Sequence, residues 1–264
     1  YKALVDRAFS EERPDIVLNF AAESHVDRSI DSSEDFVASN VLGATNIFDA
    51  SRKHHVSRVI QISTDEVYGS VEKGSFTEED NLNPSSPYSG SKAAADCMAL
   101  SYYKTHRLPV VITRSANNFG EYQFPEKLLP RFITNLISGK KVPLMWSPEN
   151  PGLNVRDWLH TRDNCRAIWL VANSGIDGEV YNIPGENEFT NIDVTRMILN
   201  HFGLGEDMIE RVEHRKAHDF RYSVSGEKLK GLGFEYKHRD FPAELGKTID
   251  WYRKNEMWWR GLAK

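Results

Sequence analysis

Tyr88 and Lys92 are the residues whose types and spacing most directly indicate chemistry. They stand four positions apart in the run Tyr-Ser-Gly-Ser-Lys, near the start of a segment predicted to be helical. Residues at i and i+4 share a helix face, and an ammonium beside a phenol favours the phenolate. The pair could therefore supply a tyrosine that acts as a base near neutral pH, while Lys92 holds the ribose hydroxyls of a nucleotide. A surface pair without a chemical role is the alternative, because this spacing is common on helices.

A second group of reactive side chains follows a short apolar run. Residues 58–63 are predicted to form a strand, and Thr64, Asp65 and Glu66 come directly after it. Polar groups at 23–25 and 117–118 also follow predicted strands. Ligands of open α/β sheets lie outside the carboxyl ends of the strands, so the three groups predict one site. Two adjacent carboxyl groups can act as acid and base if their environments differ; a solvated turn is the alternative for this pair.

The elements that must position these residues alternate along the first half of the chain. The apolar patterns predict helices at 2–12, about 34–55 and about 86–106, and buried strands at 16–20, 58–63 and 109–114. Helical crossovers between such strands favour an α/β fold with a doubly wound parallel sheet. Beyond about Gly120 the alternation weakens and prolines multiply, which predicts a smaller interleaved lobe. A last helix is predicted at about 242–255.

Composition limits the classes of function. The 264 residues are 40% hydrophobic and 27% charged, with a formal net charge of -5 and no long run of one sign. This argues against nucleic acid as a partner. The sequence contains neither an apolar run of membrane-spanning length nor a recognisable signal peptide, so we expect no membrane partner and a cytoplasmic location. Cys97 and Cys165 lie in apolar stretches and are expected to be buried free thiols. The histidines show no metal-ligand spacing, so no metal is expected.

The motifs resemble those of a known family and keep its order. Ser63/Thr64, Tyr88 and Lys92 are similar to the Ser/Thr–Tyr–Lys set of the extended short-chain dehydrogenase/reductases. Within that superfamily, the chain resembles the dTDP-glucose 4,6-dehydratases over nearly its whole length. The matching stretches are NFAAESHVDRSI (19–30), STDEVYG (63–69), YSGSK (88–92), RSANNFG (114–120), FPEKL (124–128), RDWL (156–159) and HDFRY (218–222). The acid pair after Thr64 distinguishes the dehydratases from other members of the superfamily, because its epimerases and reductases lack this pair.

The resemblance implies NAD-dependent dehydration of a nucleoside-diphosphate hexose, dTDP-glucose to dTDP-4-keto-6-deoxyglucose. Tyr88 would take the proton of the sugar 4-hydroxyl while hydride passes from carbon 4 to NAD, with Thr64 donating to the 4-oxygen. Glu66 would then remove the proton on carbon 5, and Asp65 would protonate the departing 6-hydroxyl. Hydride would return to carbon 6. The implied catalytic residues are Thr64, Asp65, Glu66, Tyr88 and Lys92.

The resemblance also implies binding residues and an assembly. The NAD-binding set is Ala21, Ala22, Ser24, Ser39, Tyr88, Lys92 and Asn118. The nucleotide-sugar set is Ser24, Thr64, Asn117, Lys127, Leu128, Pro143, Met145, Arg156, Asn191, His218 and Tyr222. Arg156 suits a diphosphate because its planar fork bonds two phosphate oxygens; a salt bridge with Asp157 or Asp163 is its alternative. Helices 34–55 and 86–106 would pair with their counterparts in the four-helix interface of a homodimer.

Two departures from the family pattern accompany the implied domains. Residues 1–120 are expected to form an NAD-binding Rossmann-like domain, and 121–264 mainly a sugar-nucleotide-binding lobe interleaved with it. The Gly-rich phosphate turn that opens such a domain does not occur in the sequence. Tyr1 in place of Met favours a chain that begins inside a larger protein, with that unit before it. Arg215-Lys216-Ala217 stands where the family has Arg-Pro-Gly before His218.

Two other functions are compatible with the sequence. One is a sugar-nucleotide 4-epimerase or decarboxylase of the same superfamily, and the acid pair Asp65-Glu66 argues against the epimerase. The other is a non-catalytic NAD-binding scaffold. A scaffold has no physical need for Thr64, the acid pair, Tyr88 and Lys92 together, so their joint presence favours an enzyme.

Overall fold

The computed structural model describes residues 2–262, which divide into two compact units. Of the described residues, the first contains 2–116, 165–184 and 223–235. The second contains 117–164, 185–222 and 236–262. Each unit is therefore assembled from separate stretches of the chain.

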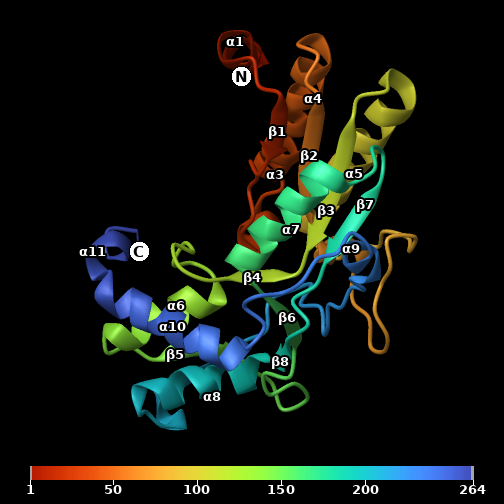
Figure 1. Cartoon of the computed structure of the whole chain (residues 1–264). Helices are drawn as coiled ribbons and strands as arrows, with labels where there is room; N and C mark the ends of the chain where they lie inside the picture. Colours follow the sequence, from red (N-terminus) through yellow and green to blue (C-terminus); the bar gives the residue numbers. More distant parts are fainter. Residues whose placement is uncertain (1, 263–264) are drawn as a thin grey trace. The chain divides into compact units, whose positions relative to one another are not determined.

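A parallel sheet forms the centre of the first unit (Figure 1). Its strands, in spatial order, are β1 (Ile16–Asn19), β2 (Arg58–Thr64), β3 (Val110–Ser115) and β7 (Val180–Ile183), and all neighbours are parallel. The β-branched residues Val59, Ile60 and Val111 fit such strands, and they are fully buried. The predicted α/β fold with a parallel sheet is confirmed. Strand β7 was not predicted from the sequence.

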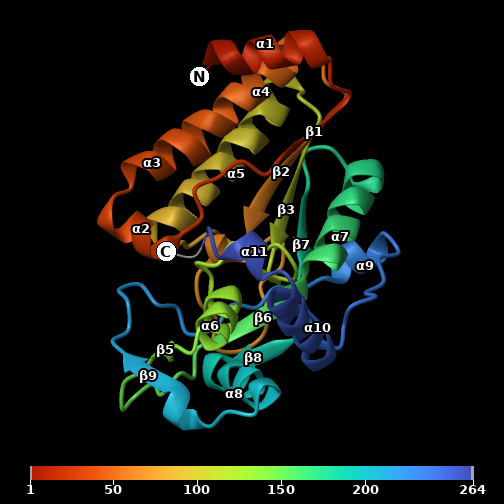
Figure 2. The same ribbon diagram turned by 90° about the vertical axis from the view of Figure 1, so that its left-hand side faces the viewer.

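Helices lie on both faces of this sheet (Figure 2). Helices α4 (Ala44–Lys53) and α5 (Pro87–His106) cover one face, and α7 (Thr161–Ser174) covers the other. The Ser86 hydroxyl accepts a hydrogen bond from the Ser89 N–H at 3.1 Å, and Ser89 bonds back to the Ser86 backbone, which caps the start of α5. The remaining helices of this unit are α1 (Lys2–Glu12), α2 (Val26–Asp31), α3 (Glu34–Phe36), the π-helix η1 (Val37–Gly43), the 3-10 helix η2 (Asp65–Tyr68) and α9 (Glu227–Gly231).

The helix predicted at 34–55 is interrupted. The structure has a short α3, then the π-helical segment η1, and then α4. π-Helical turns are rare and are frequent at functional sites. This one contains Asn40, which is buried and whose side chain bonds outside its own helix.

Two expectations about burial are wrong. Strand β1 was expected to be buried on both faces, but Leu18 and, just after the strand, Phe20 are exposed by 39% and 54%. The reason is that β1 is the edge strand of the described sheet and has a neighbour, β2, on one side. Cys97 and Cys165 are free but exposed. Cys97 follows the fully buried Asp96 on α5, and a step of one residue turns the side chain about 100° around the helix axis.

The second unit combines two small sheets with helices. Strands β4 (Asn117–Phe119), β6 (Val155–His160) and β8 (Glu188–Thr190) form one sheet, and β5 (Val142–Met145) pairs with β9 (Ile209–Val212). The helices are α6 (Leu128–Ile137), α8 (Asn191–Phe202), the 3-10 helix η3 (Glu206–Met208), α10 (Phe241–Lys254) and α11 (Glu256–Trp259). In their core, Trp158 and Phe241 are stacked, and Phe119 packs edge-on against both rings. Helix α10 confirms the helix predicted at 242–255.

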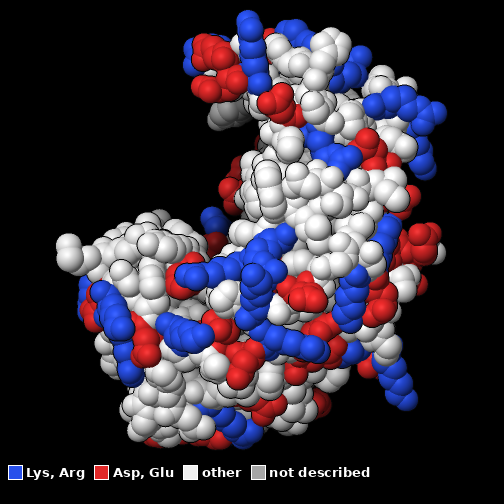
Figure 3. All heavy atoms as spheres, viewed as in Figure 1, with Lys and Arg blue, Asp and Glu red and all other residues white. Residues whose placement is uncertain are grey.

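The surface carries charges of both signs. On the face shown in Figure 3, Lys and Arg side chains are interspersed with Asp and Glu side chains. The formal net charge of the chain is -5. Within residues 2–262, none of the helices combines the length and the apolarity that a membrane span requires.

Candidate active site

Thr64, Asp65 and Glu66 lie where β2 passes into the 3-10 helix η2. Thr64 is extended, and its hydroxyl oxygen accepts a hydrogen bond from the Glu66 N–H at 3.3 Å, which caps η2. The same hydroxyl donates to Asp65 Oδ1 at 3.3 Å. Asp65 is buried, with 2% exposure, whereas Glu66 is half-buried. The two carboxyl groups therefore have different environments, as opposite roles in one reaction require.

Helix α5 brings Tyr88 and Lys92 to the same place. The Tyr88 phenol lies near the Thr64 hydroxyl. The Lys92 ammonium donates to the backbone carbonyl of Ile62 on β2 at 2.5 Å. The structure thus brings together all five residues predicted to be catalytic, because η2 and the first turns of α5 pack against each other.

Burial raises the pKa of the Tyr88 phenol, as do the carboxylates of Glu66, Asp65 and Asp96, and the nearby Thr64 hydroxyl opposes them. The Lys92 ammonium is directed at the Ile62 carbonyl. The effect of Lys92 on this phenol, expected from the spacing of the two residues, stays a prediction.

The predicted NAD-binding residues of the first unit lie in two segments. Ala21, Ala22 and Ser24 follow β1, and Ser39 lies in η1. Ala21 is exposed, and Ala22, Ser24 and Ser39 are half-buried. The carboxyl end of β1 is the sheet edge at which α/β folds bind ligands.

Asn40 connects these two segments, and the sequence analysis missed it. Its Oδ1 accepts from the Glu23 N–H at 2.8 Å, and its Nδ2 donates to the Glu23 carbonyl at 2.9 Å and to the Ser91 hydroxyl at 2.8 Å. Ser91 in turn donates to the Tyr88 carbonyl at 2.7 Å. The available signal was an asparagine inside a predicted helix, where its side chain competes with the backbone and is unfavourable.

Arg156, His218 and Tyr222 come together in the second unit. The Arg156 guanidinium lies 4.4 Å from the centre of the Tyr222 ring and donates to the carbonyl groups of Asp219 and Phe220. Burial lowers the pKa of His218 to about 3, with further contributions from Arg156 and neighbouring cations. Asp157 and Asp163, the alternative partners considered for Arg156, accept hydrogen bonds from backbone N–H groups.

The other predicted nucleotide-sugar residues begin or line elements of the second unit. Asn117 and Asn118 lie on β4, and Lys127 and Leu128 lie at the start of α6. Pro143 and Met145 share one face of β5, opposite the buried Val142 and Leu144. Asn191 is the first residue of α8, and within residues 2–262 its buried Oδ1 has no hydrogen-bond partner.

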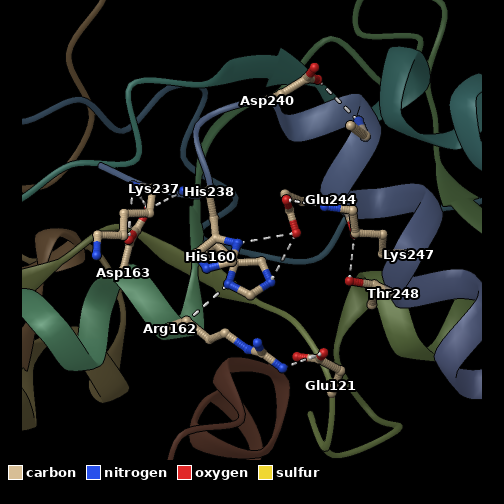
Figure 4. A network of polar contacts seen from close by, with 11 residues as sticks. Glu121, His160, Arg162, Asp163, Lys237, His238, Asp240, Glu244, Lys247 and Thr248 are labelled. Atoms are coloured by element: carbon tan, nitrogen blue, oxygen red, sulfur yellow. Dashed lines mark hydrogen bonds and ion pairs between the residues drawn. The ribbon is translucent and has the colours of Figure 1, made fainter. Parts of the chain in front are cut away.

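His160, His238 and Glu244 form a cluster of side chains of the kinds that bind metals (Figure 4). Their ligand atoms lie within 4.8 Å of one another. The Arg162 N–H donates to His160 Nδ1 at 3.2 Å, so the proton of the neutral ring lies on Nε2, which faces Glu244. A metal on Nε2 would require the other tautomer. The two rings are also stacked, 18° from parallel, so their lone pairs do not converge. We assign no metal to this cluster.

Comparison with known proteins decides the family. A family model described as GDP-mannose 4,6 dehydratase matches residues 2–237. The dTDP-glucose 4,6-dehydratase of Streptomyces antibioticus is 49% identical over 262 residues, which is 99% of this chain and 76% of that protein. The chain belongs to the dTDP-glucose 4,6-dehydratase family.

Solved structures have the same fold as this member of the dTDP-glucose 4,6-dehydratase family. DesIV, a dTDP-glucose 4,6-dehydratase from Streptomyces venezuelae crystallised with NAD and TYD, matches with a TM-score of 0.94 and 43% identity, covering 99% of this chain and 80% of DesIV. The UDP-glucose 4-epimerase of Thermus thermophilus, in complex with NAD, matches with a TM-score of 0.91 and 27% identity, covering 97% and 83%. The family resemblance stated from the motifs is therefore confirmed.

Proposed function

We propose that this protein is an NAD-dependent hydro-lyase that converts dTDP-glucose to dTDP-4-keto-6-deoxyglucose. The observation that carries the proposal is the group Thr64, Asp65 and Glu66 at the end of β2, with the Tyr88 phenol close to it. A phenol base, a hydroxyl donor and two carboxyl groups suffice for oxidation followed by elimination of water. Relatives named dTDP-glucose 4,6-dehydratase, 49% and 46% identical to this chain, support the substrate.

The hydrogen-bond donors of Lys92, on α5, fit the nicotinamide-ribose half of NAD. An ammonium has three N–H donors, and within residues 2–262 that of Lys92 has the Ile62 carbonyl as its hydrogen-bond partner. Its other donors can therefore hold ribose hydroxyls. Bound NAD supplies the acceptor for the hydride of carbon 4 and returns a hydride to carbon 6. We assign to the same cofactor the residues Ala21, Ala22, Ser24, Ser39 and Asn118.

Tyr88 and Thr64 act on the sugar 4-hydroxyl. Tyr88 takes its proton, and Thr64 donates to the 4-oxygen as a carbonyl forms. Because burial raises the pKa of Tyr88, the phenol needs a compensating positive charge to lose its own proton. Lys92 carries that charge one helical turn away.

Asp65 and Glu66 carry out the elimination. The 4-ketone acidifies the proton on carbon 5, and Glu66 removes it. Asp65 gives a proton to the departing 6-hydroxyl, which leaves as water. In this assignment the half-buried carboxylate of Glu66 is the base, and the buried carboxyl group of Asp65 is the acid.

The second unit binds the nucleotide and the diphosphate in this proposal. Arg156 and His218 contact the diphosphate, and the faces of Pro143 and Met145 on β5 contact the base. His218 stays neutral at physiological pH because its pKa is about 3, so it can donate one hydrogen bond without adding a charge beside Arg156. The remaining assignments to the nucleotide sugar are Ser24, Asn117, Lys127, Leu128, Asn191 and Tyr222.

A homodimer and a cytoplasmic location complete the proposal. Val37 and Leu42, on η1, are each 51% exposed, and Cys97 is exposed on the neighbouring helix α5. These side chains support pairing of η1, α4 and α5 with their counterparts in a second copy. We assign NAD binding to the first unit and nucleotide-sugar binding to the second.

The test is a direct assay of the full-length polypeptide. It is incubated with NAD and, separately, dTDP-glucose, UDP-glucose and GDP-mannose, and products are identified by NMR. We expect the 4-keto-6-deoxy product from dTDP-glucose. A 4-epimer without loss of water would instead assign the protein to the epimerases, and binding of NAD without turnover of any of the three sugars would support the scaffold.

A further inference from the structure

Asp96 lies one helical turn beyond Lys92 on α5 and is fully buried. Its Oδ2 accepts a hydrogen bond from Arg114 Nε on β3 at 2.9 Å and another from the Ser63 hydroxyl on β2 at 3.0 Å. Arg114 is also buried, with 3% exposure. Because residues at i and i+4 share a helix face, Asp96 is on the same side of α5 as Lys92.

Arg114 is held in place by a second set of contacts. Its Nη1 donates to the Tyr68 hydroxyl at 2.6 Å, and its guanidinium lies 4.7 Å from the centre of the Tyr68 ring. The Tyr68 hydroxyl then donates to Asn182 Oδ1 on β7 at 3.0 Å. A guanidinium is always protonated in proteins. A buried guanidinium needs an anion, so the contact between Asp96 and Arg114 is ionic.

Lys92 is a buried ammonium whose hydrogen-bond partner is neutral. It is 5% exposed and donates to the Ile62 carbonyl, and no carboxylate of residues 2–262 lies within ion-pair distance of it. Burial lowers the pKa of Lys92, and Asp96 is the group that opposes this change. Within residues 2–262, the second carboxylate oxygen of Asp96, Oδ1, has no hydrogen-bond partner.

We propose that Asp96, held by Arg114 and Ser63, is the counter-charge that keeps Lys92 protonated during the oxidation of the sugar. Asp96 does not touch the reacting atoms, so it is a positioning residue that acts through Lys92. The part played by Lys92 in that oxidation rests on the proposed function.

The other charged and titratable groups around Lys92 and Tyr88 come from the elements packed against α5. Asp65 and Glu66 on η2 face Tyr88, whereas Arg114 on β3 and Tyr68 on η2 lie beyond Asp96. Asp96 also acts on Tyr88 directly and contributes to the raised pKa of its phenol. Loss of the Asp96 charge should therefore lower the pKa values of both Lys92 and Tyr88. The two effects are separable, because Lys92 has the lower pKa and sets the acid limb of the pH–rate profile, whereas Tyr88 has the higher pKa and sets the alkaline limb.

The test is the pH dependence of sugar oxidation in Asp96→Asn. The acid limb, which the pKa of Lys92 sets, should move to lower pH by about one unit, at the low end of the change that a nearby opposite charge causes. Asp96→Glu should restore the limb towards its original position. Asp49→Asn is the matched control, because Asp49 contacts the far end of α5 through the Tyr102 hydroxyl; its profile should not change.

A second variant and a second measurement keep the proposal testable if Asp96→Asn does not fold. The double variant Asp96→Asn with Arg114→Gln removes both charges of the buried ion pair. The limb of its pH–rate profile that Lys92 sets should move in the same direction by a smaller amount. The Lys92 Cε resonance, followed by NMR in lysine-labelled protein and assigned with Lys92→Arg, reports the pKa of the ammonium without turnover. An unchanged NMR titration in both variants would overturn the proposal, as would an acid limb that moves to higher pH. If the parent protein forms no dehydrated product, the proposed function fails, and the NMR titration still decides the effect of Asp96 on Lys92.

Discussion

The ammonium of Lys92 is bonded to the carbonyl of Ile62, two residues before Thr64 on the same strand. This contact fixes the lysine to the strand that carries the hydroxyl donor of the proposed reaction. Tyr88, in contrast, reaches Thr64 itself through its phenol. The two residues of the i,i+4 pair therefore have separable roles.

Removing the phenol hydroxyl should stop proton transfer alone. We expect Tyr88→Phe to slow sugar oxidation by about 100-fold or more and to leave NAD affinity close to that of the parent. Lys92→Ala should weaken NAD binding and move the basic requirement of the pH–rate profile upward, because a positive charge that favours the phenolate is lost. The measurements are a pH profile of the first half-reaction and a cofactor titration. Tyr102→Phe on the same helix is the control; oxidation by Tyr88→Phe at the parental rate would falsify the assignment of the base.

Glu66→Gln should block removal of the carbon-5 proton. Glutamine keeps the size of the side chain but cannot act as a base, so incorporation of solvent deuterium at carbon 5 should fall by about 100-fold or more. NMR of the sugar after reaction in D2O measures this. The control is Glu79→Gln, because Glu79 is an exposed glutamate outside η2; this variant should incorporate deuterium at the parental rate. Deuterium incorporation by Glu66→Gln at the parental rate would assign the base to another residue.

Ala217→Gly should stabilise the protein. Ala217 has φ +49° in a turn, a left-handed conformation that costs a non-glycine residue about 1–2 kcal/mol. Glycine removes that strain but adds about 0.4–1 kcal/mol of unfolded-state entropy, so we expect a net gain of about 0.5–1 kcal/mol in urea unfolding. Gly203→Ala is the reciprocal control, because Gly203 has φ +68° with open space around it; it should destabilise. A loss of stability in Ala217→Gly would contradict the strain.

His218 should make stability depend on pH in the acid range. Burial and nearby cations lower its folded-state pKa to about 3, below the unfolded value of about 6.5. The unfolded chain then binds more protons, so this contribution is fully present above pH 6.5 and is lost as the pH falls towards 3. His218→Gln should reduce the slope of unfolding free energy against pH in that range. His106→Gln, at the exposed end of α5, should keep the parental slope; equal slopes in all three proteins would refute the prediction.

Leu42→Asp should produce a monomer. A charged residue at the proposed dimer interface would lose its hydration or repel the second copy, so sedimentation of the full-length polypeptide should change from dimer to monomer. Ile176→Asp is the control, since Ile176 is 65% exposed and lies outside η1, α4 and α5. A monomeric parent protein would exclude the proposed interface.

The sequence predicted much of the first unit because its signals are local. Apolar β-branched runs define β2 and β3, and Ser86 with Pro87 defines the start of α5. The carboxyl ends of parallel strands share one sheet edge, so the fold class was enough to place Thr64 and the acid pair in one site. The predicted pairing of Tyr88 with Lys92 required only the helical period.

Only the tertiary structure decided which charges act on that site. Arg114 follows Asp96 by 18 residues and Tyr68 precedes Arg114 by 46, and no local pattern indicates that the three side chains meet. The raised pKa of Tyr88 likewise depends on burial and on carboxylates from another element. The turn at Ala217 was visible in the sequence as a departure from Arg-Pro-Gly, but its strain was not. Local sequence fixes the backbone preferences of each segment, whereas solvation and electrostatic energies depend on which distant groups surround each side chain after folding.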